Sequence, residues 1–204
     1  MVKIAVIGAG FMGRTHAEAY SRIDLAQVAA VCDRDRELGE KFARDFGCSF
    51  YEDFEAMAED CEFEVADICL PTFLHEEFAV KAAEHGKHIF CEKPAALSVE
   101  SLDRMIEAAE KAGVKIMIGQ VVRFWPEYQT AKAMYGNGEL GDLNYAYGAR
   151  LSEHPAWSEW YRRPENSGGG LFDLHLHDID FFCWLLGEVE SVFASGKKNE
   201  LGCW

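Results

Sequence analysis

The sequence predicts an α/β fold, in which helices cover both faces of a parallel sheet, followed by a second domain of different pattern. Three observations support this prediction. Short apolar segments alternate with helix-forming segments from Val2 to Ile118. The apolar segments are nearly continuous, which is typical of parallel strands buried on both faces. After Gly119 the alternation stops, and aromatic residues and glycine-rich turns become frequent.

The first strand is predicted at residues 2–7 and ends in a turn with the pattern Gly8-x-Gly10-x-x-Gly13. A helix is predicted to follow at 14–21. In this context the first glycine allows a tight turn, the second lets the backbone approach a pyrophosphate, and the third lets helix and strand pack closely. The N–H groups at the helix start would bind the phosphate charge. The pattern indicates a dinucleotide site, with a glycine-rich hairpin or flexible loop as the alternative.

The second strand is predicted at 27–32 and is followed by Asp33, 20 residues after Gly13. A carboxylate at this point would accept hydrogen bonds from the ribose hydroxyls of the adenosine and would repel a 2′-phosphate. This predicts NAD rather than NADP as the cofactor. Arg34 and Arg36 are the opposing observation, because an arginine can pair with that phosphate.

The remaining elements continue the alternation and then depart from it. In the first domain, helices are predicted at 34–46, from 53, at 76–85 and at 98–112, and strands at 49–51, 65–70, 89–91 and 115–118. The change of pattern predicts domains of residues 1–122 and 123–204. In the second, helices are predicted at 123–135 and 171–186 and strands at 143–151 and 189–195. Residues 152–167 are rich in Trp, Pro, Arg and Glu, which suggests a loop that makes contacts.

The composition limits the classes of function. Of the 204 residues, 49% are hydrophobic and 27% charged, as in ordinary soluble globular proteins. The formal net charge of −15 argues against nucleic acid as a partner. No apolar run approaches the ~20 residues that a membrane helix needs. The seven scattered cysteines form no Cys-x-x-Cys pair, which argues against a disulfide framework or a zinc site and predicts a cytoplasmic location.

Cys91-Glu92-Lys93-Pro94 follows a predicted parallel strand, at the edge of the sheet where α/β proteins bind ligands. A lysine at this edge would donate a hydrogen bond to a substrate hydroxyl and favour its alkoxide as hydride leaves. Pro94 would restrain the backbone and so hold the lysine in place, and a cis peptide bond before it is one way to do so. The alternative is a solvated surface lysine before a loop proline.

The densest group of ionisable residues is Asp173, His175, His177, Asp178 and Asp180. On a helix, Asp173 and His177 share a face, and Asp180 extends the same stripe. A carboxylate one turn from a histidine would orient it and raise its pKa, which is the arrangement of a general base. One alternative is a metal site, although His175 and His177 do not converge from one helix. Another is a histidine satisfied in a helix interface.

Four motifs occur in register: the glycine turn, Pro71-Thr72-x-x-His75, Gly86-Lys-His-Ile-x-Cys91-Glu92-Lys93-Pro94, and Gly168-Gly169-Gly170-x-x-Asp173-x-x-x-His177-x-x-Asp180. Together they resemble the glucose–fructose oxidoreductase / inositol dehydrogenase (Gfo/Idh/MocA) family, from residue 1 to about 195. The resemblance implies a Rossmann domain and then an α+β domain, here incomplete, whose mostly antiparallel, open-faced sheet holds the substrate and builds homo-oligomers, a dimer or tetramer. It implies an NAD(P)-dependent oxidoreductase acting on sugars, polyols or related small molecules.

The resemblance also implies roles for individual residues. His177 would take the hydroxyl proton, Lys93 would hold the substrate oxygen, and Asp173 would orient and tune the site. Thr72, His75, Glu92 and Gln120 match positions lining the nicotinamide pocket. With the glycine turn, the expected cofactor-binding residues are Gly8, Gly10, Phe11, Met12, Gly13, Asp33, Arg34, Pro71, Thr72, His75, Glu92, Lys93 and Gln120. No resident metal is expected.

The sequence departs from the family pattern in two places. His175 stands where many members have a small residue, often glycine, which changes the shape of the pocket. Family members usually run well past 300 residues, so we expect this chain to be a fragment of a longer protein. Two other functions stay open: a cofactor-binding relative without turnover, and an enzyme that keeps its cofactor bound and passes hydride between two sugars.

Overall fold

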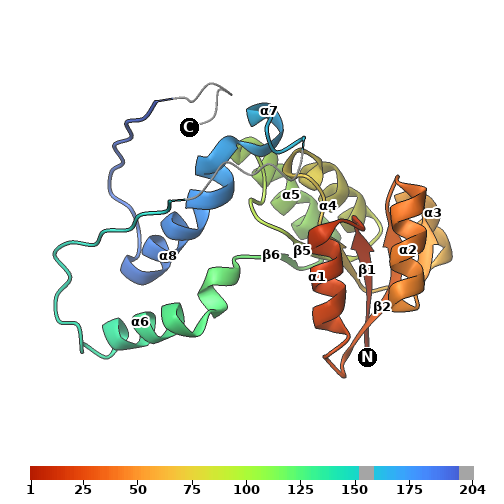
Figure 1. The fold of residues 1–204 in the computed structure, drawn as a ribbon, viewed down its shortest axis with the longest axis horizontal. Coiled ribbons are helices and arrows are strands. Elements are labelled where there is room, and N and C mark those ends of the chain that lie inside the picture. Colours follow the sequence, from red (N-terminus) through yellow and green to blue (C-terminus); the bar gives the residue numbers. More distant parts are fainter. Residues whose placement is uncertain (152–158, 198–204) are drawn as a thin grey trace. The chain divides into compact units, whose positions relative to one another are not determined.

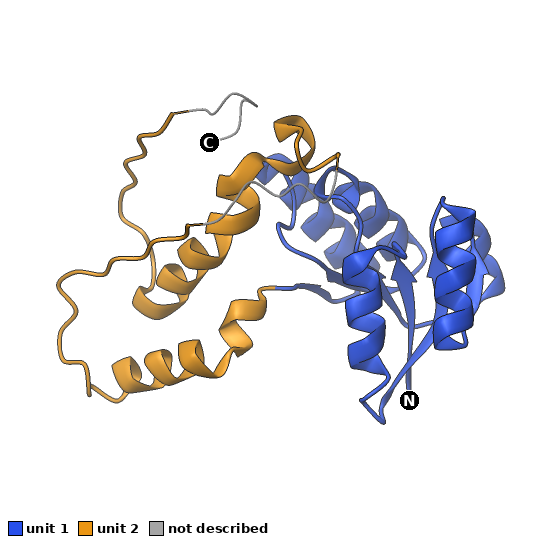
Figure 2. Cartoon of the chain, viewed as in Figure 1, with its two compact units in different colours: residues 1–119 blue, residues 120–204 orange. Residues whose placement is uncertain are grey.

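The computed structural model describes residues 1–151 and 159–197. The chain divides into two compact units, residues 1–119 and residues 120–204 (Figure 2). The first unit is an α/β sandwich around one sheet, and the described part of the second consists of helices and segments without regular secondary structure (Figure 1).

The first unit is organised around a six-stranded parallel sheet with the order β3-β2-β1-β4-β5-β6. Its strands are β1 (Val2–Ile7), β2 (Ala26–Cys32), β3 (Ser49–Tyr51), β4 (Val65–Ile68), β5 (His88–Cys91) and β6 (Ile116–Ile118). The chain moves outward from β1 to β3 and then returns to place β4 on the other side of β1. The strand order therefore reverses between β1 and β4, the point where open α/β sheets bind ligands at their carboxyl ends.

Helices cover both faces of this sheet, as predicted. They are α1 (Phe11–Tyr20), α2 (Arg36–Phe46), α3 (Phe54–Asp60), α4 (His75–Glu84) and α5 (Val99–Ala112). Ile4 and Val6 of β1 share one buried core with residues of α1 and α2. Ala5 and Ile7 share the other core with residues of α3, α4 and α5. Because successive side chains of a strand point to opposite faces, β1 contributes to both cores.

Local signals set most boundaries of the first unit. Side chains of Asp35, Asp53 and Ser98 cap α2, α3 and α5 by accepting backbone N–H groups. Gly47 ends α2 with a φ of 68°, a left-handed conformation that favours glycine. The boundaries of α1 and β4 differ from the prediction: α1 already begins at Phe11, and β4 ends at Ile68.

The second unit contains five short helical segments among its described residues. They are η2 (Val121–Phe124), α6 (Pro126–Gly136), α7 (Pro164–Ser167), η3 (Leu171–His175) and α8 (Leu176–Leu186). The predicted helix at 123–135 is divided, because Pro126 starts α6 and has no N–H to continue η2. The predicted helix at 171–186 begins with one π-helical turn, η3, and continues as α8.

The strands predicted at 143–151 and 189–195 were wrong: within the described part of the chain neither segment forms a strand. A strand obtains its hydrogen bonds from a neighbouring strand, and the described residues of this unit contain none. Tyr145 and Phe193 are accordingly 80% and 92% exposed. The expected antiparallel sheet is therefore not seen in these ranges. Of the predicted loop at 152–167, residues 152–158 lie outside the described residues, and the last four residues form α7.

The described ranges also give the state of the cysteines and the length of the apolar helices. The cysteines at 32, 48, 61, 69, 91 and 183 are free thiols, and Cys203 lies outside the described residues. No helix in residues 1–151 or 159–197 is long and apolar enough to cross a bilayer.

Candidate functional site

The three glycines of the turn between β1 and α1 differ in the space that a side chain would have. Gly8 has a φ of +106°, and a Cβ there would lie 2.8 Å from the carbonyl oxygen of Cys69. At Gly13 a Cβ would lie 1.9 Å from the carbonyl oxygen of Gly8, so only glycine lets α1 pack on the turn. Gly10 is extended, with a φ of −70°, and a Cβ there would meet nothing within 4 Å. The space beside Gly10 is therefore open, as the approach of a pyrophosphate requires.

The N-terminus of α1 also differs from those of α2, α3 and α5. It has no side-chain cap and no acidic residue in its first turn. The other three each have a capping side chain and a glutamate in the first turn. A helix leaves its first N–H groups without intrahelical partners, and its dipole favours an anion there. The N–H groups of Phe11 and Met12 are thus suited to bind a phosphate.

Asp33 lies beside the same turn. The N–H of Ala9 donates to its Oδ2 at 2.7 Å, and the N–H of Asp35 donates to its Oδ1 at 2.8 Å. These two backbone donors hold the carboxylate where a ribose diol would be bound. The neighbouring Arg34 is exposed, while Arg36 forms ion pairs with two surface glutamates, Glu40 at 3.0 Å and Glu52 at 3.2 Å.

Pro71 and Thr72 lie in the connection from β4 to α4, and His75 is the first residue of α4. Thr72 is 4% exposed and His75 only 1%. The ring of His75 lies between two carbonyl oxygens, with Nδ1 2.9 Å from that of Pro94 and Nε2 2.8 Å from that of Leu70. Burial lowers the pKa of His75. His75 thus joins the loops after β4 and β5, and its contact with the nicotinamide stays a prediction.

Glu92 and Lys93 follow β5, and both are half-buried. The N–H of Lys93 donates to Glu92 Oε2 at 3.1 Å. Glu92 Oε1 lies 3.2 Å from Nε2 of His16 on α1. The Lys93–Pro94 peptide bond is cis. Gln120 follows Gly119 at the start of the second unit, and its Oε1 is buried with no hydrogen-bond partner among the described residues.

A buried polar cluster between α1 and β4 was missed by the sequence analysis. Asp67, in a strand interpreted as continuously apolar, is 0% exposed. Its Oδ2 accepts a hydrogen bond from the hydroxyl of Tyr20 at 2.9 Å and lies 2.9 Å from His16 Nδ1. Burial would lower the pKa of His16, but hydrogen bonds to Asp67 and Glu92 outweigh it and raise that pKa to about 10. The available signal was an acid within an apolar strand, which requires a buried partner.

In the second unit, the catalytic candidates lie on η3 and α8. Asp173 is 9% exposed, and its Oδ2 accepts a hydrogen bond from the hydroxyl of Tyr161 at 2.6 Å. Ser167 Oγ in turn donates to the carbonyl oxygen of Tyr161 at 3.0 Å. The sequence did not predict Tyr161 as a site residue, because nothing in the local pattern connects it with Asp173, twelve positions later. His177 is half-buried near the start of α8.

Two other acids of this segment form bidentate pairs with arginines. Arg150 donates to the carboxylate of Asp178 at 2.7 and 2.8 Å, which lowers the pKa of that carboxyl. Arg123 donates to Asp180 at 2.8 and 2.6 Å. Asp180, which was predicted to extend the stripe of Asp173 and His177, is therefore paired with Arg123. Within the ranges described, no three metal-ligating side chains converge in this segment.

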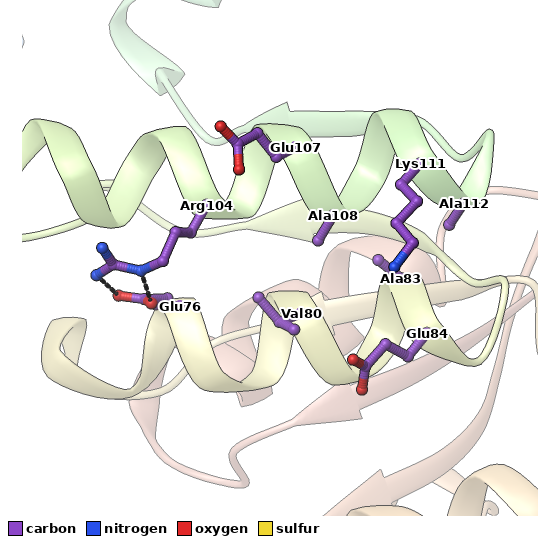
Figure 3. A pocket seen from close by; sticks show the side chains of 9 residues that line it. All are labelled: Glu76, Val80, Ala83, Glu84, Arg104, Glu107, Ala108, Lys111 and Ala112. Atoms are coloured by element: carbon purple, nitrogen blue, oxygen red, sulfur yellow. Dashed lines mark hydrogen bonds and ion pairs between the residues drawn. The ribbon is translucent and has the colours of Figure 1, made fainter.

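A groove of about 590 Å³ lies between α4 and α5 (Figure 3). It is lined by alanines and by charged side chains, and Arg104 Nη2 donates to Glu76 Oε2 at 2.9 Å at one end. It contains none of the predicted site residues. The candidate site is thus the glycine turn with the loops after β2, β4 and β5, together with the separate Tyr161–Asp173 and His177 segment of the second unit.

Comparisons with known proteins identify the family of the chain. Residues 2–120 match the family model described as "Oxidoreductase family, NAD-binding Rossmann fold", and residues 128–202 match "GFO/IDH/MocA C-terminal domain". Over 96% of its length the chain is 34% identical to myo-inositol 2-dehydrogenase of Thermotoga maritima and 32% identical to 2,7-anhydro-N-acetylneuraminate hydratase of Mediterraneibacter gnavus.

Among solved structures, 91% of the chain superposes on 54% of GenD2 from gentamicin A biosynthesis, a complex with NAD, at 26% identity and a TM-score of 0.80. The chain spans 58% of the inositol dehydrogenase and 52% of the hydratase, so it covers about half the length of these curated relatives. Its Rossmann sheet, its motifs and these matches show that the chain belongs to the GFO/IDH/MocA family of NAD-binding oxidoreductases.

Proposed function

We propose that the chain carries the cofactor domain, residues 1–122, and the beginning of the substrate domain, residues 123–204, of an NAD-dependent dehydrogenase acting on a sugar or polyol hydroxyl. The observation that carries the proposal is the open space beside Gly10, next to an uncapped helix start and a fixed Asp33. An anionic dinucleotide with a free ribose diol fits these three features.

Different residues of the first unit would bind different parts of NAD. The backbone at Gly10 and the N–H groups of Phe11 and Met12 hold the pyrophosphate, and Asp33 holds the ribose diol. Thr72, His75, Glu92 and Gln120 are assigned to the nicotinamide end. When bound, the nicotinamide supplies a hydride acceptor.

The proposed chemistry needs one base and one hydrogen-bond donor at the substrate hydroxyl. His177 removes the hydroxyl proton, as general bases do. Lys93 donates a hydrogen bond to the same oxygen and stabilises the developing alkoxide. Asp173, whose carboxylate is held by the Tyr161 hydroxyl, orients the site. Lys93 belongs to the first unit and the other two to the second, so this catalytic set draws on both.

The relatives support the substrate class. The myo-inositol 2-dehydrogenase supports a polyol, and the hydratase favours a second candidate, a reaction that adds water to a sugar derivative without net oxidation. The two candidates differ in one measurable product. A dehydrogenase accumulates NADH in proportion to turnover, whereas a hydratase forms product with no net change in NADH.

The test of the cofactor site is Gly10→Val, assayed by NADH fluorescence titration. Because a Cβ at this position meets no protein atom within 4 Å, we expect an unchanged fold by circular dichroism. We expect NADH binding to weaken by about 10²-fold, since the side chain occupies the phosphate space. The control is Gly136→Val, at another glycine with open surroundings. Unchanged NADH affinity in Gly10→Val, or no NADH binding by the unsubstituted chain, would contradict the proposal.

A further inference from the structure

His16 connects two carboxylates that belong to different elements of the first unit. Its Nδ1 lies 2.9 Å from Asp67 Oδ2 on β4, and its Nε2 lies 3.2 Å from Glu92 Oε1 after β5. The ring stacks on Phe90, with centroids 5.6 Å apart and planes inclined by 25°. Side-chain exposure is 14% for His16, 0% for Asp67 and 12% for Glu92. The imidazole is therefore held on both nitrogens and on one face.

The same bridge fixes Glu92 from several directions. One carboxylate oxygen meets His16, and the other accepts the N–H of Lys93 at 3.1 Å. A Cβ at Gly119 would lie 3.0 Å from Glu92 Oε1, so the backbone after β6 passes close to the carboxylate. A side chain restrained in this way has one position relative to the Lys93 peptide.

A metal ion is the competing explanation, because ligand atoms of His16, Asp67 and Cys69 lie within 4.8 Å of one another. The polar atoms of this cluster already have partners of their own. Asp67 Oδ2 accepts the Tyr20 hydroxyl at 2.9 Å and lies 2.9 Å from His16 Nδ1, and the other ring nitrogen of His16 faces Glu92 at 3.2 Å. These contacts favour a hydrogen-bonded bridge.

We propose that His16 is a positioning residue for the nicotinamide end of the cofactor, because its bridge from Asp67 fixes the Glu92 carboxylate and the Glu92–Lys93 peptide. The inference rests on the proposed function, which assigns Glu92 to the nicotinamide. The glycine turn and Asp33 are assigned to the other end of the dinucleotide, and the backbone donors that hold the Asp33 carboxylate are those of Ala9 and Asp35.

The test is His16→Gln, with Kd measured for two ligands. NADH uses the whole site, whereas ADP-ribose contains the adenosine, the ribose and the pyrophosphate but no nicotinamide. Loss of a charge-assisted hydrogen bond to Glu92 should weaken NADH binding by about tenfold. ADP-ribose affinity should stay within about twofold. His85→Gln is the matched control, because His85 pairs with Glu55 at 2.6 Å elsewhere in the first unit.

A second variant distinguishes a loss of Glu92 positioning from a loss of stability caused by the uncompensated charge of Asp67. His16→Gln leaves two carboxylates without their cation, and a loss of fold would follow from Asp67 alone. His16→Gln with Asp67→Asn removes that buried charge and should recover the Tm. NADH binding should stay about tenfold weaker in this double variant, because Glu92 still lacks its partner.

The outcomes separate the two proposals. A selective loss for NADH in both variants supports positioning. Equal losses for both ligands, no loss for either, or recovery of NADH affinity in the double variant would overturn it. An unsubstituted chain that binds neither ligand would instead refute the proposed function.

Discussion

Both units of this chain contain apolar segments that were predicted as strands, yet among the described residues only those of the first unit form strands. In the first unit all six strands are paired in one sheet, with helices on both faces. In the second, the described segments 143–151 and 189–195 form no strand, and Tyr145 and Phe193 are exposed. An apolar segment by itself is thus not sufficient for a strand, because strand formation needs a hydrogen-bonding partner.

The largest expected effect tests how rigidly the first unit is built. Gly13→Val places a Cβ 1.9 Å from a backbone oxygen that cannot move aside, so we expect a loss of at least about 3 kcal/mol in the free energy of unfolding. Gly136→Ala in the second unit meets nothing within 4 Å and should leave stability unchanged or raise it by up to about 1 kcal/mol. Urea unfolding measures both, and equal effects would contradict the comparison.

Turnover tests whether both units contribute chemistry. Lys93→Ala in the first unit and His177→Ala in the second should each lower kcat/KM by about 10²-fold or more, the scale of acid–base groups. NADH affinity should hardly change. Steady-state kinetics on a substrate from a polyol panel measure this, with the surface variants Lys81→Ala and His85→Ala as controls. Full activity of either test variant would show that its role is wrongly assigned.

Cofactor choice depends on the first unit alone. Asp33→Ser removes the carboxylate that would repel a 2′-phosphate, so we expect NADP binding to tighten by about tenfold relative to NAD. Arg36→Ala is the control and should leave the ratio unchanged, because Arg36 is paired with Glu40 and Glu52. The two dissociation constants decide the outcome. Tighter NADP than NAD binding by the unsubstituted chain would sink the prediction of NAD.

The stability of a Tyr161 variant tests whether the buried contact with Asp173 stabilises the second unit. Tyr161 is 2% exposed and donates to Asp173, so Tyr161→Phe should cost about 1 kcal/mol by removing a partner from a buried carboxylate. Tyr145→Phe removes the same hydroxyl from an 80% exposed side chain and should cost nothing measurable. Denaturant midpoints for the two variants give the comparison. Identical midpoints would mean that the Tyr161–Asp173 contact adds no stability.

The last comparison is a pH dependence within the first unit. His16 has a folded-state pKa of about 10, above the ordinary value of 6.5, so the folded state retains a proton that the unfolded state releases. Its stabilising contribution is complete below pH 6.5 and declines as the pH rises through about 10. The slope of unfolding free energy against pH in this window should be shallower in His16→Gln. An unchanged slope would show that His16 is not the group involved.

The sequence by itself determined the elements whose signals are local. Gly8, Gly10 and Gly13 predicted the turn between β1 and α1, and Ser98 predicted the start of α5. The assignment of Asp33 to the ribose stays a prediction. Helices obtain their hydrogen bonds and caps from residues a few positions away, so their pattern can be recognised in a short window. The alternation of these elements was sufficient to predict a parallel sheet covered on both faces.

Only the tertiary structure decided the contacts between distant residues. His16, Asp67 and Glu92 meet because α1, β4 and β5 are neighbours around the point where the strand order reverses. The Tyr161–Asp173 contact and the unpaired segments of the second unit have the same origin. Burial of a charge and pairing of a strand depend on what the fold brings alongside, and no short stretch of sequence contains that partner.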